Sequence, residues 1–273
     1  MVYPRWWLNQ QSEKAVEGLS VLDLINAGTL DCKLASLLWI LMEHRTSVLV
    51  ASGPAWAGKT TLLNSILDFL PPEIQQISLQ GYFEDFRFLN YSKPEKSYLV
   101  AEEISNHGFA EYLWGHKAVK VFHLLSQGYH IGSTLHARSS EETIYYLNKY
   151  LGLSASVLVQ LGIIVNLRAT AGRRDEDEPI RRITSIEIIL PAQEKLMIQS
   201  LAARQSTENG FNYLGDKDLQ RVLAEKYFIG KYSVAMEMDT RSRFLKHLLE
   251  TGKSSRKEVR KSVAQYHRSE LKR

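Results

Sequence analysis

The chain has 273 residues, of which 44% are hydrophobic and 23% charged, and this composition excludes a disordered or fibrous protein. Its single cysteine, Cys32, excludes a disulfide within the chain and favours a reducing compartment. The net charge of +4 is uneven, because residues 253–273 carry eight basic and two acidic side chains. The sequence has neither a signal-peptide pattern nor the roughly 18 apolar residues of a membrane helix, so we expect a cytoplasmic protein.

The hydrophobic pattern predicts three parts in chain order. Residues 1–45 form an N-terminal lead-in that is helical from residue 20. Residues 46–191 alternate helices with short apolar strands, expected at 47–52, 77–79, 98–101, 131–135, 161–167 and 183–190. Such strands are typical of an α/β protein whose mainly parallel sheet is flanked by helices. A charged turn at 171–180 is expected to join the last two strands as a hairpin, and 192–273 is expected to be a helical C-terminal subdomain without further strands.

A phosphate-binding loop follows the strand at 47–52. The sequence GPAWAGKT begins at Gly53 and fits G-x-x-x-x-G-K-[ST], and a helix is expected immediately after it. Glycines let the backbone turn around phosphates, the helix N-terminus attracts anions, the lysine binds the β- and γ-phosphates, and the threonine hydroxyl binds Mg²⁺. The predicted nucleotide-binding residues are Gly53, Pro54, Ala55, Trp56, Ala57, Gly58, Lys59, Thr60 and Thr61. We therefore predict that the chain binds ATP and Mg²⁺.

Two acids end the apolar strand at 98–101, which we expect to lie beside the strand that precedes the loop. A P-loop enzyme needs a carboxylate there to hold Mg²⁺ or to activate water. Because side chains alternate along a strand, only one of Glu102 and Glu103 is expected to face the phosphates. The alternative is that both are surface acids at a strand end.

A histidine, His136, ends another buried strand, at 131–135. In this position it can sense a γ-phosphate or hydrogen-bond to the acidic strand. A histidine at a strand end is also a common structural residue, and spacing alone does not distinguish the two roles.

Taken together, these segments resemble the secretion-motor ATPases, RecA-like P-loop NTPases that drive type II and type IV secretion, type IV pili and the archaeal flagellum. The similarity also covers residues 22–30 (LDLINAGTL), 38–39 (LW), 62–64 (LLN) and 181–187 (RRITSIE). The resemblance implies that Glu103 is the catalytic glutamate and a Mg²⁺ ligand with Thr60, and that His136 is the histidine of the family's His box. It also implies a hexamer that works against a membrane-platform protein at the inner face of the membrane.

The chain departs from this family at several positions. Glu102 replaces a glycine, Tyr129 replaces a histidine, and Ser105-Asn106 replaces an Arg-Asp pair. The acids of the family's Asp box are replaced by residues 79–81 (LQG), and only Glu84 matches a later acid. An arginine-bearing segment shrinks to residues 86–97, and the family's large N-terminal domain has no counterpart. The resemblance is therefore to a divergent, short member.

Three functions follow from these observations. The first is an ATPase motor of a secretion or pilus-like machine, with slow hydrolysis because charged groups are missing. The second is an ATP-binding regulator or scaffold that hydrolyses little or nothing. The third, translocation of nucleic acid by the basic tail, rests on net charge alone and is disfavoured, since the tail lacks aromatic residues spaced for base stacking.

Overall fold

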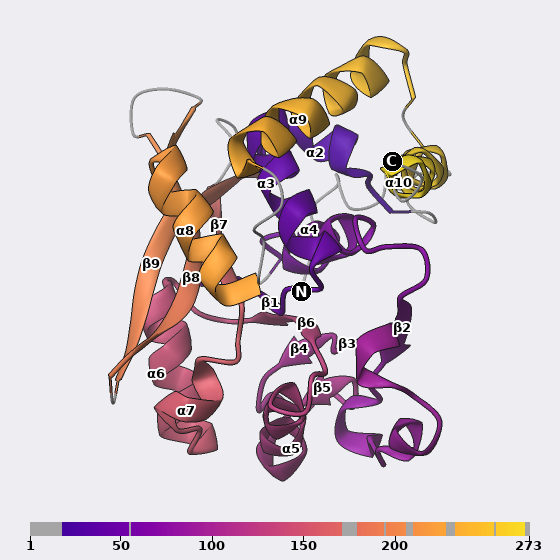
Figure 1. The fold of residues 1–273 in the computed structure, drawn as a ribbon. Coiled ribbons are helices and arrows are strands. Elements are labelled where there is room, and N and C mark those ends of the chain that lie inside the picture. Colours follow the sequence, from indigo (N-terminus) through magenta and orange to yellow (C-terminus); the bar gives the residue numbers. More distant parts are fainter. Residues whose placement is uncertain are drawn as a thin grey trace.

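The computed structural model describes residues 18–54, 56–170, 179–193, 195–205, 210–227, 233–253 and 255–270. The fold is α/β, with a large central sheet between two layers of helices (Figure 1). The strands are β1 (Val48–Ala51), β2 (Gln75–Ser78), β3 (Ser97–Val100), β4 (Glu103–Ile104), β5 (Tyr112–Leu113), β6 (Ile131–Leu135), β7 (Ile163–Thr170), β8 (Ile180–Ala192), β9 (Lys195–Arg204) and β10 (Phe211–Tyr213).

The α-helices divide between the two faces of the sheet. They are α2 (Val21–Asn26), α3 (Cys32–Glu43), α4 (Lys59–Leu67), α5 (Gly115–Leu125), α6 (Ser140–Leu151), α7 (Ala155–Leu158), α8 (Asp216–Tyr227), α9 (Val234–Glu250) and α10 (Arg256–Glu270). Short 3₁₀ helices η2 (Gly81–Phe83), η3 (Arg87–Asn90) and η4 (Pro94–Lys96) lie between β2 and β3. None of the described helices is both long enough and apolar enough to cross a bilayer.

The main sheet has the order β10-β9-β8-β7-β1-β6-β3-β2, and β4 pairs with β5 in a separate small sheet. Strands β7, β1, β6, β3 and β2 run parallel, whereas β8, β9 and β10 add antiparallel pairings at one edge. The expected parallel core is therefore confirmed. The expectation that β3 borders β1 is wrong, because β6 lies between them and pairs with both.

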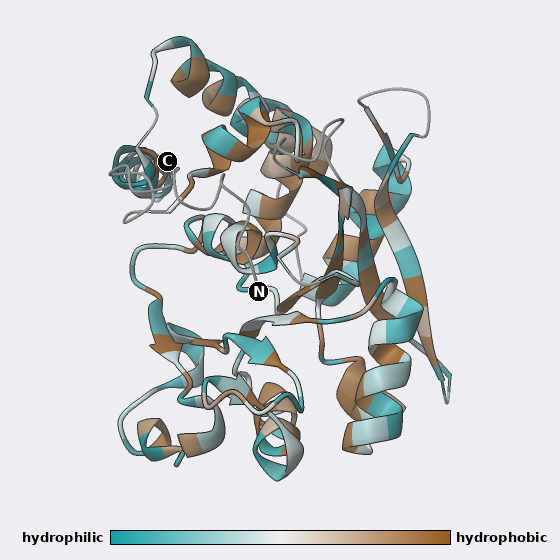
Figure 2. Ribbon diagram, turned by 180° about the vertical axis from the view of Figure 1, so that it is seen from behind, coloured by the Kyte–Doolittle hydropathy of each residue, from teal (hydrophilic) through white to brown (hydrophobic). Residues whose placement is uncertain are grey.

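Strand β1 explains why the core is buried on both faces. Val48 and Val50 pack into the hydrophobic cluster beneath α3 and α4, whereas Leu49 and Ala51 pack into the cluster beneath α5 and α6. Successive side chains of a strand point to opposite faces, so a strand covered on both faces must be apolar throughout. Figure 2 shows hydrophobic colouring concentrated in the central strands, whereas the covering helices carry both hydrophobic and hydrophilic colours.

The segment after residue 191 differs from the expectation. It contains β9 and β10 before the helices begin, so the statement that strands end there is wrong. The β9 sequence KLMIQSLAAR alternates only over residues 195–198, where Leu196 and Ile198 pack against the core while Lys195 and Met197 are exposed. Residues 171–178 of the expected turn lie outside the described part of the chain. The antiparallel pairing of β7 with β8 fits a hairpin.

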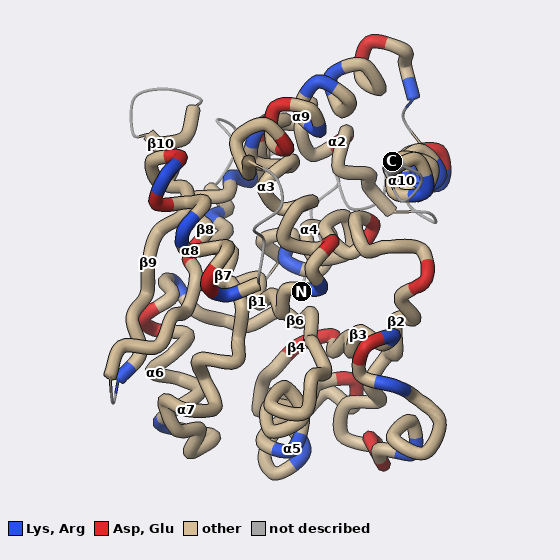
Figure 3. Tube along the Cα trace, viewed as in Figure 1, with Lys and Arg blue, Asp and Glu red and all other residues tan. Residues whose placement is uncertain are grey.

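The C-terminal helix α10 packs against the body of the protein through one face. Val259 and Val263 are buried, and Arg256 forms an ion pair with Asp68 at 2.5 Å (Nε to Oδ2). Its other basic side chains Lys257, Arg260, Lys261 and Arg268 are exposed, and Figure 3 shows blue segments along this helix. The basic residues therefore occupy the solvated face of a docked amphipathic helix.

Candidate functional site

The phosphate-binding loop connects β1 to α4, at the carboxyl edge of the parallel strands. Gly58 caps α4 with a left-handed backbone (φ 88°), a conformation that favours glycine. Helix α4 begins at Lys59 and leaves the backbone N–H groups of its first turn directed at the loop, which makes an anion site. Trp56 is 71% exposed, so its side chain does not fill the loop. Ala55 lies outside the described residues.

Three of the expected site residues meet at this helix terminus. The Lys59 Nζ atom lies 3.2 Å from His136 Nε2 and 3.6 Å from Glu103 Oε2. His136 Nε2 lies 3.3 Å from the same carboxylate oxygen, and His136 Nδ1 lies 3.2 Å from the carbonyl oxygen of Gly53. The cluster Lys59–Glu103–His136 therefore joins the phosphate-binding loop, β4 and the end of β6, which are far apart in the chain.

Sheet topology explains this meeting. His136 follows β6 directly, and β6 pairs with β1 in parallel, so their carboxyl ends lie side by side. Glu103 opens β4, the short strand that continues from β3 after a bend at Glu102. Thr134 donates a hydrogen bond to the Glu102 carbonyl at 2.9 Å, which ties this bend to β6. Parallel strands place their carboxyl ends at one edge, the usual location of ligand sites in open α/β sheets.

The electrostatics of the cluster leave one acceptor unused. Burial lowers the pKa of Lys59, and the nearby Glu103 carboxylate opposes that shift. Glu103 itself is 5% exposed, and its Oε1 atom has no hydrogen-bond partner among the described residues. A buried carboxylate oxygen without a donor is costly, and such groups are commonly found where a ligand or water binds.

The second acid also reaches the loop, which differs from the expectation that only one would. Thr60 Oγ1 lies 3.5 Å from Glu102 Oε1, so Glu102 faces Thr60 while Glu103 faces Lys59. Strand alternation does not apply here, because β3 ends at Val100 and the chain bends before β4 begins. No local sequence pattern assigns a separate position to each acid.

Other residues near the cluster were not singled out from the sequence. His107 lies edge-on to His136 with ring centroids 5.9 Å apart, and Ser105 Oγ lies 2.7 Å from His107 Nδ1. Ser105 thus holds a second histidine beside the first. His107 lies in a segment without a local sequence pattern, so only the fold identifies it.

Glu84, the only acid that matches the family's Asp box, has a structural role. It is 5% exposed, and its carboxylate accepts hydrogen bonds from the backbone N–H groups of Gln80 (2.8 Å) and Phe86 (2.6 Å). Both oxygens are used to close the loop around η2. Glu84 therefore stabilises a turn in the loop.

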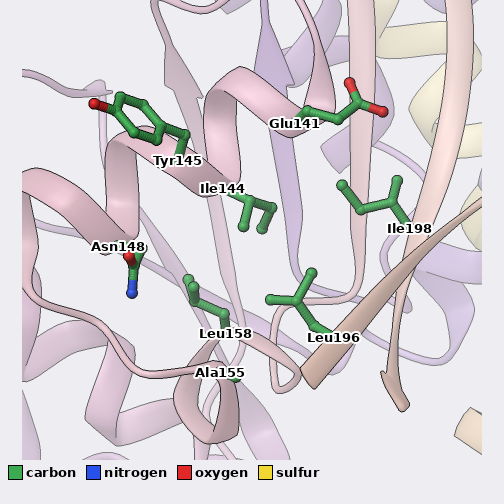
Figure 4. A pocket seen from close by; sticks show the side chains of 8 residues that line it. All are labelled: Glu141, Ile144, Tyr145, Asn148, Ala155, Leu158, Leu196 and Ile198. Atoms are coloured by element: carbon green, nitrogen blue, oxygen red, sulfur yellow. The ribbon is translucent and has the colours of Figure 1, made fainter. Parts of the chain in front are cut away.

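Two cavities lie away from this cluster. One, of about 290 Å³, is an open hollow between α6, α7 and β9, where Ile144, Leu158 and Leu196 face one another (Figure 4). The other, of about 890 Å³, contains Lys226 and His130 at the opposite edge of the strands. Neither cavity is lined by a loop residue, but a P-loop holds phosphates by backbone N–H groups at its surface and needs no deep cavity. The geometry around Lys59 is therefore the better guide to the site.

No protein-family model matches the chain. An uncharacterized protein, MJ1287, of Methanocaldococcus jannaschii is 26% identical over 89% of this chain and 96% of its own length. A second uncharacterized protein of that organism, MJ0900, is 37% identical over 62 residues, which are 23% of this chain and 11% of that protein. These relatives carry no described activity.

Among solved structures, the chain is similar to the VirB11 ATPase of the Brucella suis type IV secretion system, with 20% identity, a TM-score of 0.41 and coverage of 61% of this chain and 55% of that one. It is also similar to the Yersinia pseudotuberculosis ATPase DotB, with 12% identity, a TM-score of 0.44 and coverage of 91% and 63%. The Legionella pneumophila DotB gives 13% identity, a TM-score of 0.36 and coverage of 80% and 58%. The chain thus spans less than two thirds of each, and likenesses of this degree decide nothing about its activity.

Proposed function

We propose that this chain is an ATPase that binds Mg·ATP at residues 53–61. The observation that carries the proposal is the meeting of Lys59, Glu103 and His136 at the N-terminus of α4. A lysine, a carboxylate and a histidine from three separate elements are brought to the one helix end that attracts phosphate. Buried ionisable groups gathered in this way are more common at active sites than elsewhere.

The residues present fit both ligands of the proposal. The loop supplies backbone N–H groups and Lys59 for the phosphates, while Thr60 and Glu102 supply a hydroxyl and a carboxylate on one side. No group of three or more His, Cys, Asp or Glu side chains suited to a metal occurs among the described residues. The hydroxyl of Thr60 and the carboxylate of Glu102 suit Mg²⁺, which takes one or two protein oxygens and completes its shell with phosphate and water.

Glu103 is the proposed base for hydrolysis. Its Oε2 atom is shared by Lys59 and His136, and its Oε1 atom is free among the described residues to accept a proton or orient a water. A γ-phosphate that binds Lys59 competes with Glu103 for the ammonium group and so releases the carboxylate. His136 bridges the carboxylate to the Gly53 carbonyl and is the proposed sensor of that change.

The machine that this ATPase serves is inferred from the sequence resemblance alone. Residues 22–30, the loop and 181–187 resemble secretion-motor ATPases, so we propose a motor of a type II or type IV secretion or pilus-like system. The same resemblance supports a hexamer, a cytoplasmic location at the inner face of a membrane and a membrane-platform partner. Nucleic acid is not a proposed partner.

A second candidate function is an ATP-binding regulator or scaffold with little hydrolysis. The structural role of Glu84 favours it, because the only acid left from the Asp box is committed to backbone hydrogen bonds. Catalysis of phosphoryl transfer is mostly electrostatic, and removal of one charge-stabilising group can lower the rate by roughly 10²–10³.

The deciding experiment measures Mg·ATP binding and phosphate release by wild type, Lys59→Ala and Glu103→Gln. The motor proposal expects turnover by wild type, loss of binding in Lys59→Ala, and binding without turnover in Glu103→Gln. Equal, background release by wild type and Glu103→Gln would favour the regulator. No binding of ATP by wild type would refute both.

A further inference from the structure

An arginine of β8 lies against the phosphate-binding loop. A Cβ atom added to Gly58 would lie 2.8 Å from Arg181 Cδ and 3.1 Å from Arg181 Nε. Arg181 is therefore in direct contact with the residue that caps α4. At the other end of the loop, a Cβ atom on Gly53 would lie 2.9 Å from Arg138 Cγ.

The pairing of β8 explains why this arginine reaches the loop. Arg181 is the partner of Ala169 in β7, and β7 borders β1, the strand that leads into the loop. The next residue, Arg182, has a different role, since it donates a hydrogen bond to the Ala27 carbonyl at 2.8 Å. Neighbouring residues of a strand point to opposite sides. Arg182 therefore contacts the segment after α2, whereas Arg181 lies against the phosphate-binding loop.

The Arg181 side chain lacks an anionic partner among the described residues. The side chain is half-buried, and its guanidinium has neither a hydrogen bond nor an ion pair with any described residue. The Arg181 side chain lies beside the N-terminus of α4, against Gly58, the residue that precedes Lys59. Lys59 has Glu103 as its acidic partner, whereas Arg181 has none among the described residues, so a phosphate group bound at this helix terminus would supply the negative charge that Arg181 lacks.

We propose that Arg181 binds the phosphates of the nucleotide from within the same chain. This inference rests on the proposed ATP site and adds a residue that the loop motif does not contain. A guanidinium offers a planar set of donors that can bind two phosphate oxygens at once. The loop therefore holds the phosphate chain between its backbone N–H groups and Arg181.

The test compares Arg181→Met with Arg181→Ala and Arg181→Lys by titration of Mg·ATP at constant ionic strength. Methionine keeps an unbranched apolar stem over Gly58 but removes the charge, so it separates packing from phosphate binding. We expect Arg181→Met and Arg181→Ala each to weaken ATP binding about tenfold or more, with part of the affinity kept by Arg181→Lys. The control Arg243→Ala, at an exposed position of α9, should bind as wild type does.

Two results would overturn the inference while leaving the ATP site intact. The first is wild-type affinity in Arg181→Met, which would mean that the arginine only packs on the loop. The second is an equal loss in Arg243→Ala, which would mean that the effect is one of general charge. Failure of wild type itself to bind ATP would instead refute the proposed function.

Discussion

Two clusters in this molecule each combine a glutamate, a histidine and a lysine or arginine, and they differ in whether a carboxylate oxygen is left without a partner among the described residues. In the first, Glu103 is shared by Lys59 and His136 through one carboxylate oxygen. In the second, between α3, α9 and α10, each oxygen of Glu43 has a basic side chain beside it: Arg241 at Oε2, and His267 with its Nδ1 atom 3.7 Å from Oε1. The open oxygen of Glu103 is available for chemistry, whereas Glu43 is saturated.

The position of each cluster accounts for the difference. The Glu43 cluster lies between helices, where Trp39 donates to His267 Nε2 at 3.2 Å and stacks on Phe69 with centroids 5.1 Å apart. Burial alone would raise the pKa of Glu43, but the hydrogen bond to His267 and the charge of Arg241 lower it to about 2. The Glu103 cluster lies at the edge of the sheet, beside a loop. One carboxylate thus stabilises the packing of three helices, and the other is buried beside the phosphate-binding loop with one oxygen unpaired among the described residues.

Replacement of the histidine in the site should have the largest effect. His136→Ala removes the group that joins Glu103 to Gly53, and we expect phosphate release to fall roughly 10²-fold with little change in melting temperature. Single-turnover assays with Mg·ATP measure the rate. His247→Ala, at an exposed histidine of α9, is the control and should keep full activity. Phosphate release by His136→Ala at the wild-type rate would mean that the Glu103 cluster is structural, like the Glu43 cluster.

Replacement of the acid in the interior cluster should act on stability. Glu43→Gln breaks the ion pair with the buried Arg241, which keeps Glu237 as a second acidic partner, so we expect a loss of about 1.5 kcal/mol in the free energy of unfolding. Urea denaturation gives this quantity, and ATP affinity of the folded protein should stay unchanged. Glu95→Gln, at an exposed acid of η4, should be neutral. A loss below about 0.5 kcal/mol, the usual range for surface substitutions, would place Glu43 among exposed ion pairs.

The pH dependence of unfolding follows from the same residue. A carboxyl whose pKa is lowered by folding contributes stability above its unfolded pKa and loses it as pH falls toward the folded value. The contribution of Glu43 should therefore be complete above pH 4.5 and vanish toward pH 2. The measurement is the difference in unfolding free energy between wild type and Glu43→Gln, which should shrink across this window. A difference that stays constant with pH would contradict the assignment.

The smallest predicted effect concerns Mg²⁺. Glu102→Gln removes the carboxylate nearest Thr60 Oγ1, and we expect the Mg²⁺ concentration for half-maximal ATP binding to rise about tenfold. Binding of ATP at varied Mg²⁺ measures this without reference to turnover. The matched control is Glu111→Gln, which replaces an exposed acid directly before β5. Identical Mg²⁺ requirements in the two variants would show that Glu102 is a surface acid only.

The sequence alone determined the features that depend on neighbouring residues. The loop from Gly53 to Thr60, the helix after it and the apolar strands at 97–100 and 131–135 follow from local pattern, because glycine spacing and buried periodicity are properties of short segments. The antiparallel extension β9–β10 was missed, since alternation in β9 is limited to residues 195–198 and β10 has only three residues.

Only the tertiary structure decided which residues share the site. The insertion of β6 between β1 and β3 brings His136 to Lys59, and the bend after β3 lets Glu102 and Glu103 reach different loop residues. Arg181 lies 122 positions after Lys59 in the chain and reaches the loop through the pairing of β8 with β7. Contacts between distant segments depend on strand order and register, which local sequence patterns do not encode.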